Sequence, residues 1–169
     1  MLQTFGNRLF ILCFASLLLL SCKETKSSIC IDIPENANQN IVYDTAELFS
    51  KTERDSLAYK IIQFEKQTTN QTAILTIDSI PKHIDIMEFG KEVANYWGIG
   101  TKEKDNGLLI TISRYDRKIA INTGLGTEKT ILDYECKIII DSVMVPQFRK
   151  TQYYKGVDKA LDALFALWD

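Results

Sequence analysis

The feature that most constrains the fold is a pair of short apolar runs joined by a polar turn. The runs occupy residues 108–112 and 118–122, and Arg114-Tyr115-Asp116-Arg117 lies between them. Each run contains two isoleucines, and short runs rich in β-branched residues are typical of strands. A short polar connection joins antiparallel neighbours. The sequence therefore predicts a β-hairpin and excludes an all-helical domain.

Helical patterns and one more apolar run surround this hairpin. Residues 72–77 are apolar and β-branched, which predicts a buried strand. Ser50 and Glu53 form a capping box, in which the two side chains satisfy free amides at a helix start. Apolar residues then recur at helical spacing. Further helices are expected at 86–97, ending at Gly98, at about 128–145, ending at Pro146, and from about Thr151 onward.

The order of these elements restricts the topology. A strand–helix–strand connection favours a parallel first pair, and the hairpin then adds an antiparallel neighbour. Helices can cover both faces of such a sheet. We therefore predict an α/β fold, a three-layer α/β/α sandwich with a small mixed central sheet and about four helices, as one domain over residues 41–169.

The N-terminus has the pattern of an export signal. Arg8 precedes an apolar run at residues 9–20, which is too short to cross a bilayer comfortably. Leu20-Ser21-Cys22 resembles the lipobox of bacterial lipoproteins, which implies a signal peptide at 1–21 and lipid on Cys22. The domain would then be attached to a membrane of the cell envelope, outside the cytoplasm, and Lys23 favours the outer membrane. The alternative is an ordinary secreted protein with an accidental cysteine.

Residues 22–40 are polar and show no hydrophobic period, so they are predicted to be a flexible tether. Cys30 lies in this tether and Cys136 in a predicted helix. The two could pair in an oxidising compartment, or they could be a tail thiol and a small packed thiol. The net charge of −2, with no basic stripe, excludes the electrostatic pattern of nucleic-acid binding.

Several polar residues are expected at one end of the hairpin. Asp105-Asn106-Gly107 precedes its first strand, Glu128 follows its second, and Asp133 comes five residues later in the chain. These side chains could converge on one crevice, and oxygen ligands on glycine-rich loops suit Ca²⁺ or Mg²⁺. From spacing alone, turn chemistry is the preferred explanation of Asp105, and a favourable charge at a helix start is the preferred explanation of Glu128.

The sequence offers few groups for covalent catalysis. His83 is the only histidine, and no serine lies in a nucleophile-elbow motif. A Cys136–His83 pair is an open alternative, although a cysteine in an apolar helix is more often a packing residue. Arg117 could clamp a phosphate, but hairpin geometry puts it at the far end from Asp105.

The ordered set of motifs resembles the TPM-domain family. It consists of Val42-x-Asp44-x-Ala46, Trp97-Gly98-Ile99-Gly100, Asp105-Asn106-Gly107, Asp116-Arg117-Lys118, Thr123-Gly124-x-Gly126-x-Glu128, Asp133, Pro146-x-Phe148 and Tyr154-x-Gly156. The match covers roughly residues 41–165. Leu125 stands where an aromatic residue is common in the family. Many bacterial members also continue into a membrane helix, whose place the lipid at Cys22 would take here.

The resemblance implies an α/β sandwich with a calcium or magnesium crevice. The family's acidic positions correspond here to Asp44, Asp105, Glu128 and Asp133, with Asn106 as a lesser candidate ligand. Some relatives resemble accessory factors of membrane complexes, and one plant member is described as an acid phosphatase. We therefore expect a membrane-anchored, metal-binding envelope protein that acts as a non-catalytic accessory or maintenance factor for a membrane complex. The alternative is a low-specificity, metal-dependent acid phosphatase.

Overall fold

The computed structural model describes residues 32–168. The predicted signal peptide, the predicted lipid site Cys22 and Cys30 lie outside the described residues. The last part of the predicted tether is packed on the domain. The Trp97 indole donates to the Pro34 carbonyl at 2.9 Å, and the Tyr43 hydroxyl donates to the Glu35 carbonyl at 3.0 Å. The carbonyls of Pro34 and Glu35 thus have hydrogen-bond partners on the domain that the polar composition of this segment does not reveal.

The sheet has four strands in the order β1-β2-β3-β4. These are β1 (Val42–Asp44), β2 (Gln71–Ile77), β3 (Gly107–Ser113) and β4 (Lys118–Thr123). The first three are parallel, and β4 returns antiparallel to β3. The predicted mixed sheet and hairpin are therefore confirmed. Strand β1 was not predicted, since three residues are too few to show a period.

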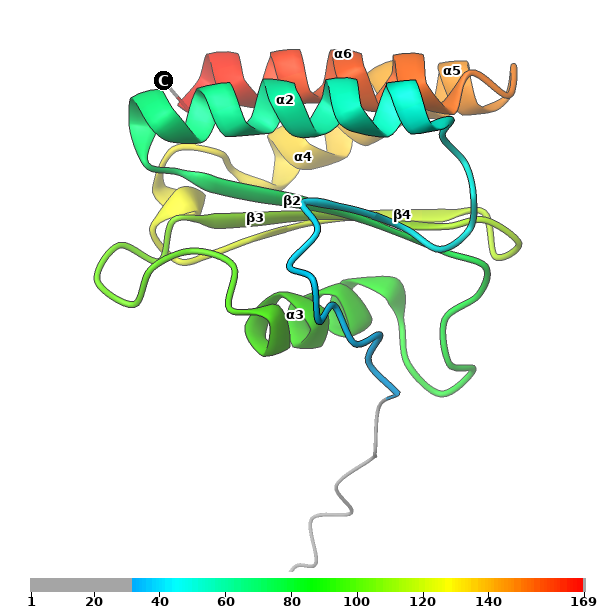
Figure 1. Cartoon of the computed structure of the whole chain (residues 1–169), viewed down its shortest axis with the longest axis horizontal. Coiled ribbons are helices and arrows are strands. Elements are labelled where there is room, and N and C mark those ends of the chain that lie inside the picture. The colour runs from blue at the N-terminus through cyan, green and yellow to red at the C-terminus, as the bar shows by residue number, and fades with distance from the viewer. Residues whose placement is uncertain (1–31, 169) are drawn as a thin grey trace, which may run out of the picture. The chain divides into compact units, whose positions relative to one another are not determined.

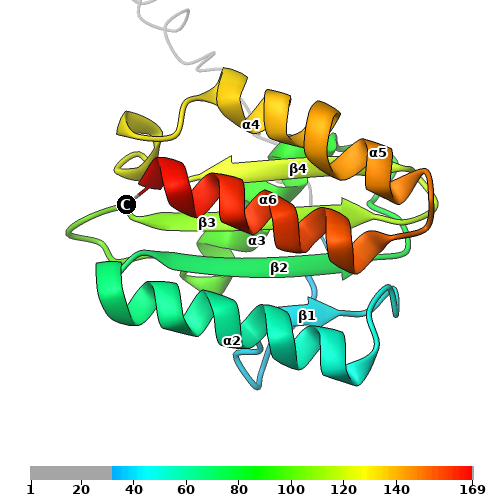
Figure 2. The same ribbon diagram turned by 90° about the horizontal axis from the view of Figure 1, so that it is seen from above.

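Helices lie on both faces of the sheet, which confirms the three-layer α/β/α architecture (Figure 1). Helix α3 (Ile86–Trp97) covers one face alone. The other face carries α2 (Lys51–Thr68), α4 (Asp133–Ile139), α5 (Val145–Phe148) and α6 (Tyr153–Trp168), and Figure 2 shows α6 running beside α2 across it. Within residues 32–168, no helix combines the length and the apolar character needed to cross a membrane.

Two apolar clusters hold the layers together. Ile74, Ile110 and Leu161 belong to the cluster beneath α2 and α6, where Phe64 stacks on Phe165 with 3.9 Å between ring centroids. The second cluster lies between the sheet and α3. Strand β3 is buried along its whole length, because alternate side chains enter the two clusters. The continuous apolar character of its sequence follows from this position.

The third predicted helix differs from the expectation. A 3₁₀ turn, η1 (Thr127–Lys129), comes first, and α4 starts only at Asp133. The Glu135 carboxylate accepts from the Leu132 amide at 2.8 Å and so caps this later start. The helix also passes the predicted stop at Pro146. A π-helical turn, η2 (Ile140–Met144), precedes α5, and proline is tolerated in the first turn of a helix, where its missing amide is not needed.

Candidate functional site

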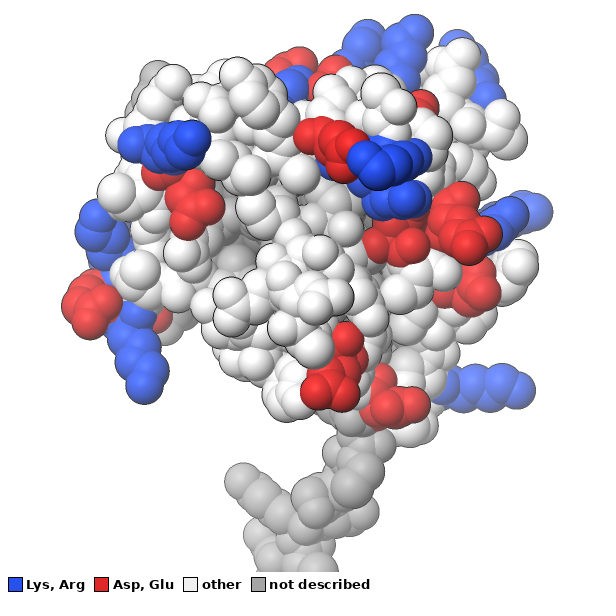
Figure 3. Space-filling view, viewed as in Figure 1, with Lys and Arg blue, Asp and Glu red and all other residues white. Residues whose placement is uncertain are grey.

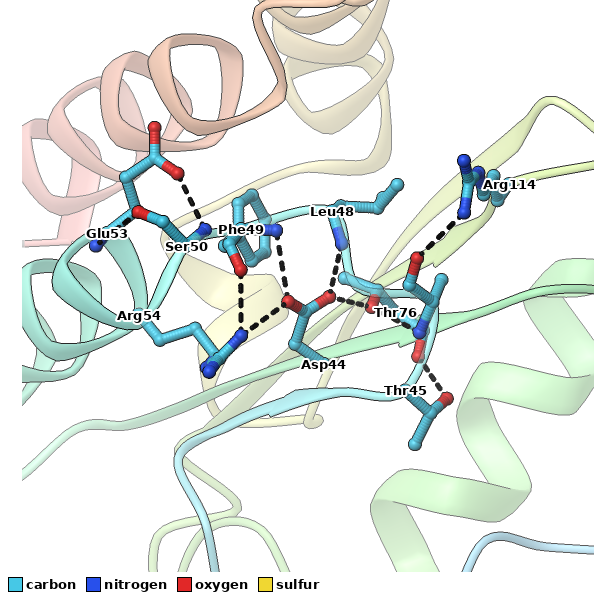
Figure 4. Close-up of polar contacts among 10 residues, drawn as sticks. Asp44, Thr45, Leu48, Phe49, Ser50, Glu53, Arg54, Thr76 and Arg114 are labelled. Carbon is cyan, nitrogen blue, oxygen red and sulfur yellow. Dashed lines mark hydrogen bonds and ion pairs between the residues drawn. The ribbon is translucent and has the colours of Figure 1, made fainter.

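Asp44, at the carboxyl end of β1, is enclosed by hydrogen-bond donors. Its carboxylate accepts from the amides of Leu48 at 2.9 Å and Phe49 at 3.0 Å, and from the Thr76 hydroxyl. The Arg54 guanidinium lies 3.3 Å from Oδ2 (Figure 4). The Asp44 side chain is 0% exposed. Its acceptor positions are therefore used within the protein, and the carboxylate stabilises the turn between β1 and α2.

Further bonds attach this turn to the neighbouring strands. The Thr45 hydroxyl donates to the Thr76 carbonyl at 2.6 Å, and the Ala46 amide donates to the Thr76 hydroxyl at 3.2 Å. From the end of β3, Arg114 donates to the Ala46 carbonyl at 3.1 Å (Figure 4). The carboxyl ends of β1, β2 and β3 are thus joined by one polar network.

The structure separates Asp44 from the other predicted ligands. Asp44 pairs with Thr76 of β2, and Thr76 pairs with Ile112 of β3. Gly107 opens the same strand five positions earlier, a separation of roughly 17 Å along an extended chain. Asp105 precedes Gly107 and lies beyond that end. The expectation that Asp44 shares one crevice with Asp105 is therefore wrong, because the two residues lie at opposite ends of the sheet.

Asp105 and Glu128 lie on two loops that meet at the other end of the sheet. The Asp105 carbonyl accepts from the Gly126 amide at 3.1 Å and, more weakly, from the Thr127 amide at 3.4 Å. A Cβ atom on Gly124 would collide with the Asp105 carbonyl, and one on Gly126 with the Lys104 carbonyl. The two glycines therefore permit the close approach. The Asp105 and Glu128 residues themselves are exposed.

Asn106, the lesser candidate ligand, has a structural role. It is 4% exposed, its Oδ1 accepts from the Thr101 amide at 3.0 Å, and its Nδ2 donates to the Thr69 carbonyl at 2.7 Å. The amide therefore connects the loop before β3 to the end of α2. This position fixes the backbone on which Asp105 sits.

Asp133 is the exposed first residue of α4, one turn before Cys136. Burial, followed by the nearby charges of Asp133, Glu135 and Glu128, raises the pKa of the Cys136 thiol to about 11. Glu128 and Asp133 thus share the surroundings of one thiol. That thiol is protonated at neutral pH, and Cys136 has no disulfide partner among residues 32–168.

The residues present do not form a closed metal site. Within residues 32–168, no group of three or more histidine, cysteine, aspartate or glutamate side chains is placed to hold a metal ion. Asp105, Glu128 and Asp133 are nevertheless exposed at one end of the fold. Hard cations also accept backbone carbonyls and water as ligands. Any cation held by these three exposed residues would therefore keep much of its water.

The groups considered for catalysis are dispersed. His83 is exposed in the connection that leads to α3, whereas Cys136 is packed in the cluster under α2 and α6. The sheet lies between them, so they do not form a pair. Arg117 lies in the turn between β3 and β4, at the end of the sheet away from Asp105.

Sequence reasoning missed a cavity of about 590 Å³ at the open edge of β2. Its walls come from residues 35–41, the start of β2 and the end of α3, and they include Tyr96 and Trp97. The sequence placed Trp97 only as the last residue of a predicted helix. Two adjacent aromatic residues before Gly98 were the available signal, because one helix face cannot bury both.

Comparisons with known proteins agree on the family and the fold. A family model described as TPM domain matches residues 42–167, and no curated protein matches the chain. The solution structure of the N-terminal domain of a P. gingivalis protein is 25% identical, with a TM-score of 0.72 over 80% of this chain and 88% of that one.

Two further solution structures are below 25% identity and show the fold alone. BA42 from Bizionia argentinensis has 16% identity and a TM-score of 0.63, covering 74% of this chain and 88% of its own. The N-terminal domain of a Corynebacterium glutamicum protein has 14% identity and a TM-score of 0.58, covering 82% of this chain and 85% of its own. Because the family model spans most of the sequence, the chain belongs to the TPM domain family.

Proposed function

We propose that this protein is a lipid-anchored envelope component whose TPM domain binds a divalent cation and assists a membrane complex without catalysing a reaction. The observation that carries the proposal is the junction of two loops at one end of the sheet. There the Asp105 carbonyl accepts from the Gly126 amide, and the side chains of Asp105 and Glu128 face solvent from adjoining loops.

The chemistry of this junction suits Ca²⁺ or Mg²⁺. Both ions prefer oxygen ligands, and Ca²⁺ accepts six to eight of them, including carbonyls and water. Asp105 and Glu128 would supply carboxylates, with Asp133 as a third from the start of α4. The ion would bridge the two loops, which are already joined through the backbone.

Three features support a binding role over hydrolysis. The Cys136 thiol has a raised pKa and is buried, so it is a poor nucleophile. His83 lies on the other side of the sheet from Cys136. The Arg117 guanidinium belongs to the opposite end of the sheet from the proposed cation site, so it is not placed to hold a phosphate there.

The anchor follows from the predicted lipid site at Cys22. Pro34 and Glu35 are hydrogen-bonded to the domain, so residues 22–31 would set the distance between the domain and the lipid. Residues 22–31 would span at most about 35 Å when fully extended. Such a tether would keep the domain close to the membrane surface, within reach of a membrane-embedded partner.

Titration of the full chain in detergent with Ca²⁺ and Mg²⁺ tests the cation site. We expect NMR shifts centred on Asp105 and Glu128, and weaker binding in Asp105→Asn and Glu128→Gln. Asp55→Asn is the matched control, because Asp55 is an exposed carboxylate on α2, away from both loops. If the wild-type protein gives no response to either ion, the cation proposal is lost.

Two further measurements test the other parts of the proposal. Hydrolysis of para-nitrophenyl phosphate by the purified chain, abolished by Asp105→Asn, would replace the accessory role with a phosphatase. Labelling of cells with a radioactive fatty acid tests the anchor. We expect label in the wild-type protein and none in Cys22→Ala, and equal labelling of both would remove the anchor.

A further inference from the structure

We propose that the cavity at the open edge of β2 is a binding site for a neutral saccharide. The cavity measures about 590 Å³, within the range of small-ligand sites in proteins. Asp105, Glu128 and Asp133 are not among its lining residues, so it is distinct from the proposed cation site. The face that carries this edge has a hollow bordered mainly by uncharged side chains (Figure 3).

Hydrogen bonds within the protein fix the walls of the cavity. The Asn36 side chain donates to the Asn40 carbonyl at 3.0 Å and accepts from the Asn40 amide at 2.9 Å, which closes one wall. On the other side, Gln71 accepts from the Gly100 amide at 2.7 Å and donates to Glu65 at 3.1 Å. The walls are therefore formed before a ligand arrives, which reduces the entropy lost on binding.

Part of the edge of β2 is left uncovered by β1. Strand β1 covers β2 only from Ile74 to Thr76, so the stretch from Gln71 to Ala73 faces the cavity. Thr72 is 5% exposed, and its hydroxyl has no hydrogen-bond partner. This oxygen has less than 1 Å² of exposed surface, so a ligand in the cavity would meet the main-chain edge of β2 rather than this hydroxyl.

Two aromatic side chains provide the apolar part of the lining. Trp97 is held by its bond to the Pro34 carbonyl and by an edge-on contact with Tyr43, at 5.5 Å between ring centroids. Tyr96 is 64% exposed. A sugar ring offers a face of C–H bonds to the negative face of an aromatic ring, and hydroxyls to surrounding amides and carboxylates. The lining supplies both kinds of contact.

The charges of the lining select among ligand classes. Glu35 and Glu65 belong to it, and it contains no lysine or arginine. A phosphate or carboxylate ligand would meet repulsion without a compensating cation. A purely apolar ligand would remove water from the Glu35 and Glu65 carboxylates without replacing its hydrogen bonds. A neutral ring bearing many hydroxyls avoids both penalties, since carboxylates and amides accept and donate to hydroxyl groups.

An added β-strand fits less well. The open edge of β2 is three residues long, and the wall formed by residues 35–41 lies beside it. Strands that bind by edge pairing gain affinity from a row of main-chain hydrogen bonds, and a three-residue edge offers only a short row. The geometry therefore favours a compact ring over an extended peptide.

Calorimetric titration of the full chain in detergent tests the proposal with two neutral probes, N-acetylated chitotriose and maltotriose. We expect binding of at least one, with NMR shifts at Thr72 and Trp97. The trimer of galacturonic acid is the anionic control and should bind more weakly. Failure of both neutral probes at millimolar concentration, or equally tight binding of the acidic trimer, would overturn the proposal.

A matched pair of tyrosines separates a local effect from a general one. Tyr96, on α3, lines the cavity and is 64% exposed. Tyr59, on α2, is not a lining residue and is 65% exposed. Tyr96→Ala should lower saccharide affinity about tenfold, whereas Tyr59→Ala should leave it unchanged. Equal behaviour of the two variants would contradict an aromatic contact with the sugar.

Discussion

The two ends of the central sheet use acidic residues in opposite ways. At the carboxyl end of the parallel strands, the Asp44 carboxylate is fully enclosed and accepts from two amides, a hydroxyl and a guanidinium. At the other end, Asp105 contributes its carbonyl to the structure and leaves its side chain in solvent. The comparison shows that a carboxylate already saturated by the protein serves the fold, and only an unsaturated one is available to a ligand.

Removing the Asp44 carboxylate is the strongest test of this difference. Asp44→Asn would replace one of the two acceptor oxygens by an NH₂ donor and remove the charge that faces Arg54, and should lower the free energy of unfolding by about 3 kcal/mol. Asp105→Asn should change it by less than about 0.5 kcal/mol, because the side chain is exposed and asparagine tolerates the positive φ of 48°. Urea unfolding followed by circular dichroism measures both. Similar losses in the two variants would contradict the comparison.

The loop end depends on backbone contact instead, and Gly126→Ala tests that. The added Cβ would collide with the Lys104 carbonyl and push the two loops apart, at a cost of about 2 kcal/mol. Gly98→Ala is the control, because Gly98 has a φ of 68° but no atom within 4 Å of the new Cβ. It should cost only about 1 kcal/mol from backbone strain. Only Gly126→Ala should shift the NMR signals of Asp105, and a shift of equal size in Gly98→Ala would contradict the contact.

Acid should also act mainly through the carboxyl end. The Ser113 hydroxyl and the Ile80 amide donate to Asp116 and lower its pKa in the folded protein. Because this pKa is lower in the folded protein, ionised Asp116 stabilises the fold at any pH above the unfolded-state value near 4. This stabilisation is lost as the pH falls below that value and through the folded-state pKa. Asp116→Asn should therefore differ from wild type at pH 7 and approach it near pH 3, in urea midpoints measured across that range. A constant difference would contradict this linkage.

Much of the fold was predictable because its signals are local or periodic. The Ser50–Glu53 capping box starts α2 as expected, and Gly98 ends α3 in the left-handed conformation. The interruption of the third helix was not predictable. Nothing in the apolar spacing of residues 128–145 marks the late start of α4 at Asp133. The π-helical turn then places Pro146 at the beginning of the short helix α5 rather than after the end of a helix.

The candidate site was predictable only as far as hairpin topology reaches. Because β3 and β4 are antiparallel, Asp105 and Glu128 had to lie at the same end of the sheet. Asp44 was placed with them by family resemblance alone, and its strand β1 is too short to be recognised in the sequence. The cavity beside β2 depends on how far β1 extends and on the docking of residues 32–40, and neither has a local signal.

The smallest expected effect concerns the charges around Cys136. Burial is the main cause of its raised pKa, and Asp133, Glu135 and Glu128 add to it through charge. In a Cys30→Ser background, Glu128→Gln should therefore lower this pKa and speed reaction with a thiol reagent at pH 9, by less than about threefold. Urea stability should stay unchanged, so faster unfolding cannot account for the rate.

Asp55→Asn removes an exposed charge from α2 and should leave the rate alone. If Glu128→Gln behaves like this control, Glu128 does not act on the thiol. If it also lowers stability, Glu128 supports the fold as Asp44 does, and the two ends of the sheet no longer differ in how they use acidic side chains. A faster reaction at constant stability would instead mean that the Glu128 charge acts on its surroundings while remaining free, which is the condition for binding a cation.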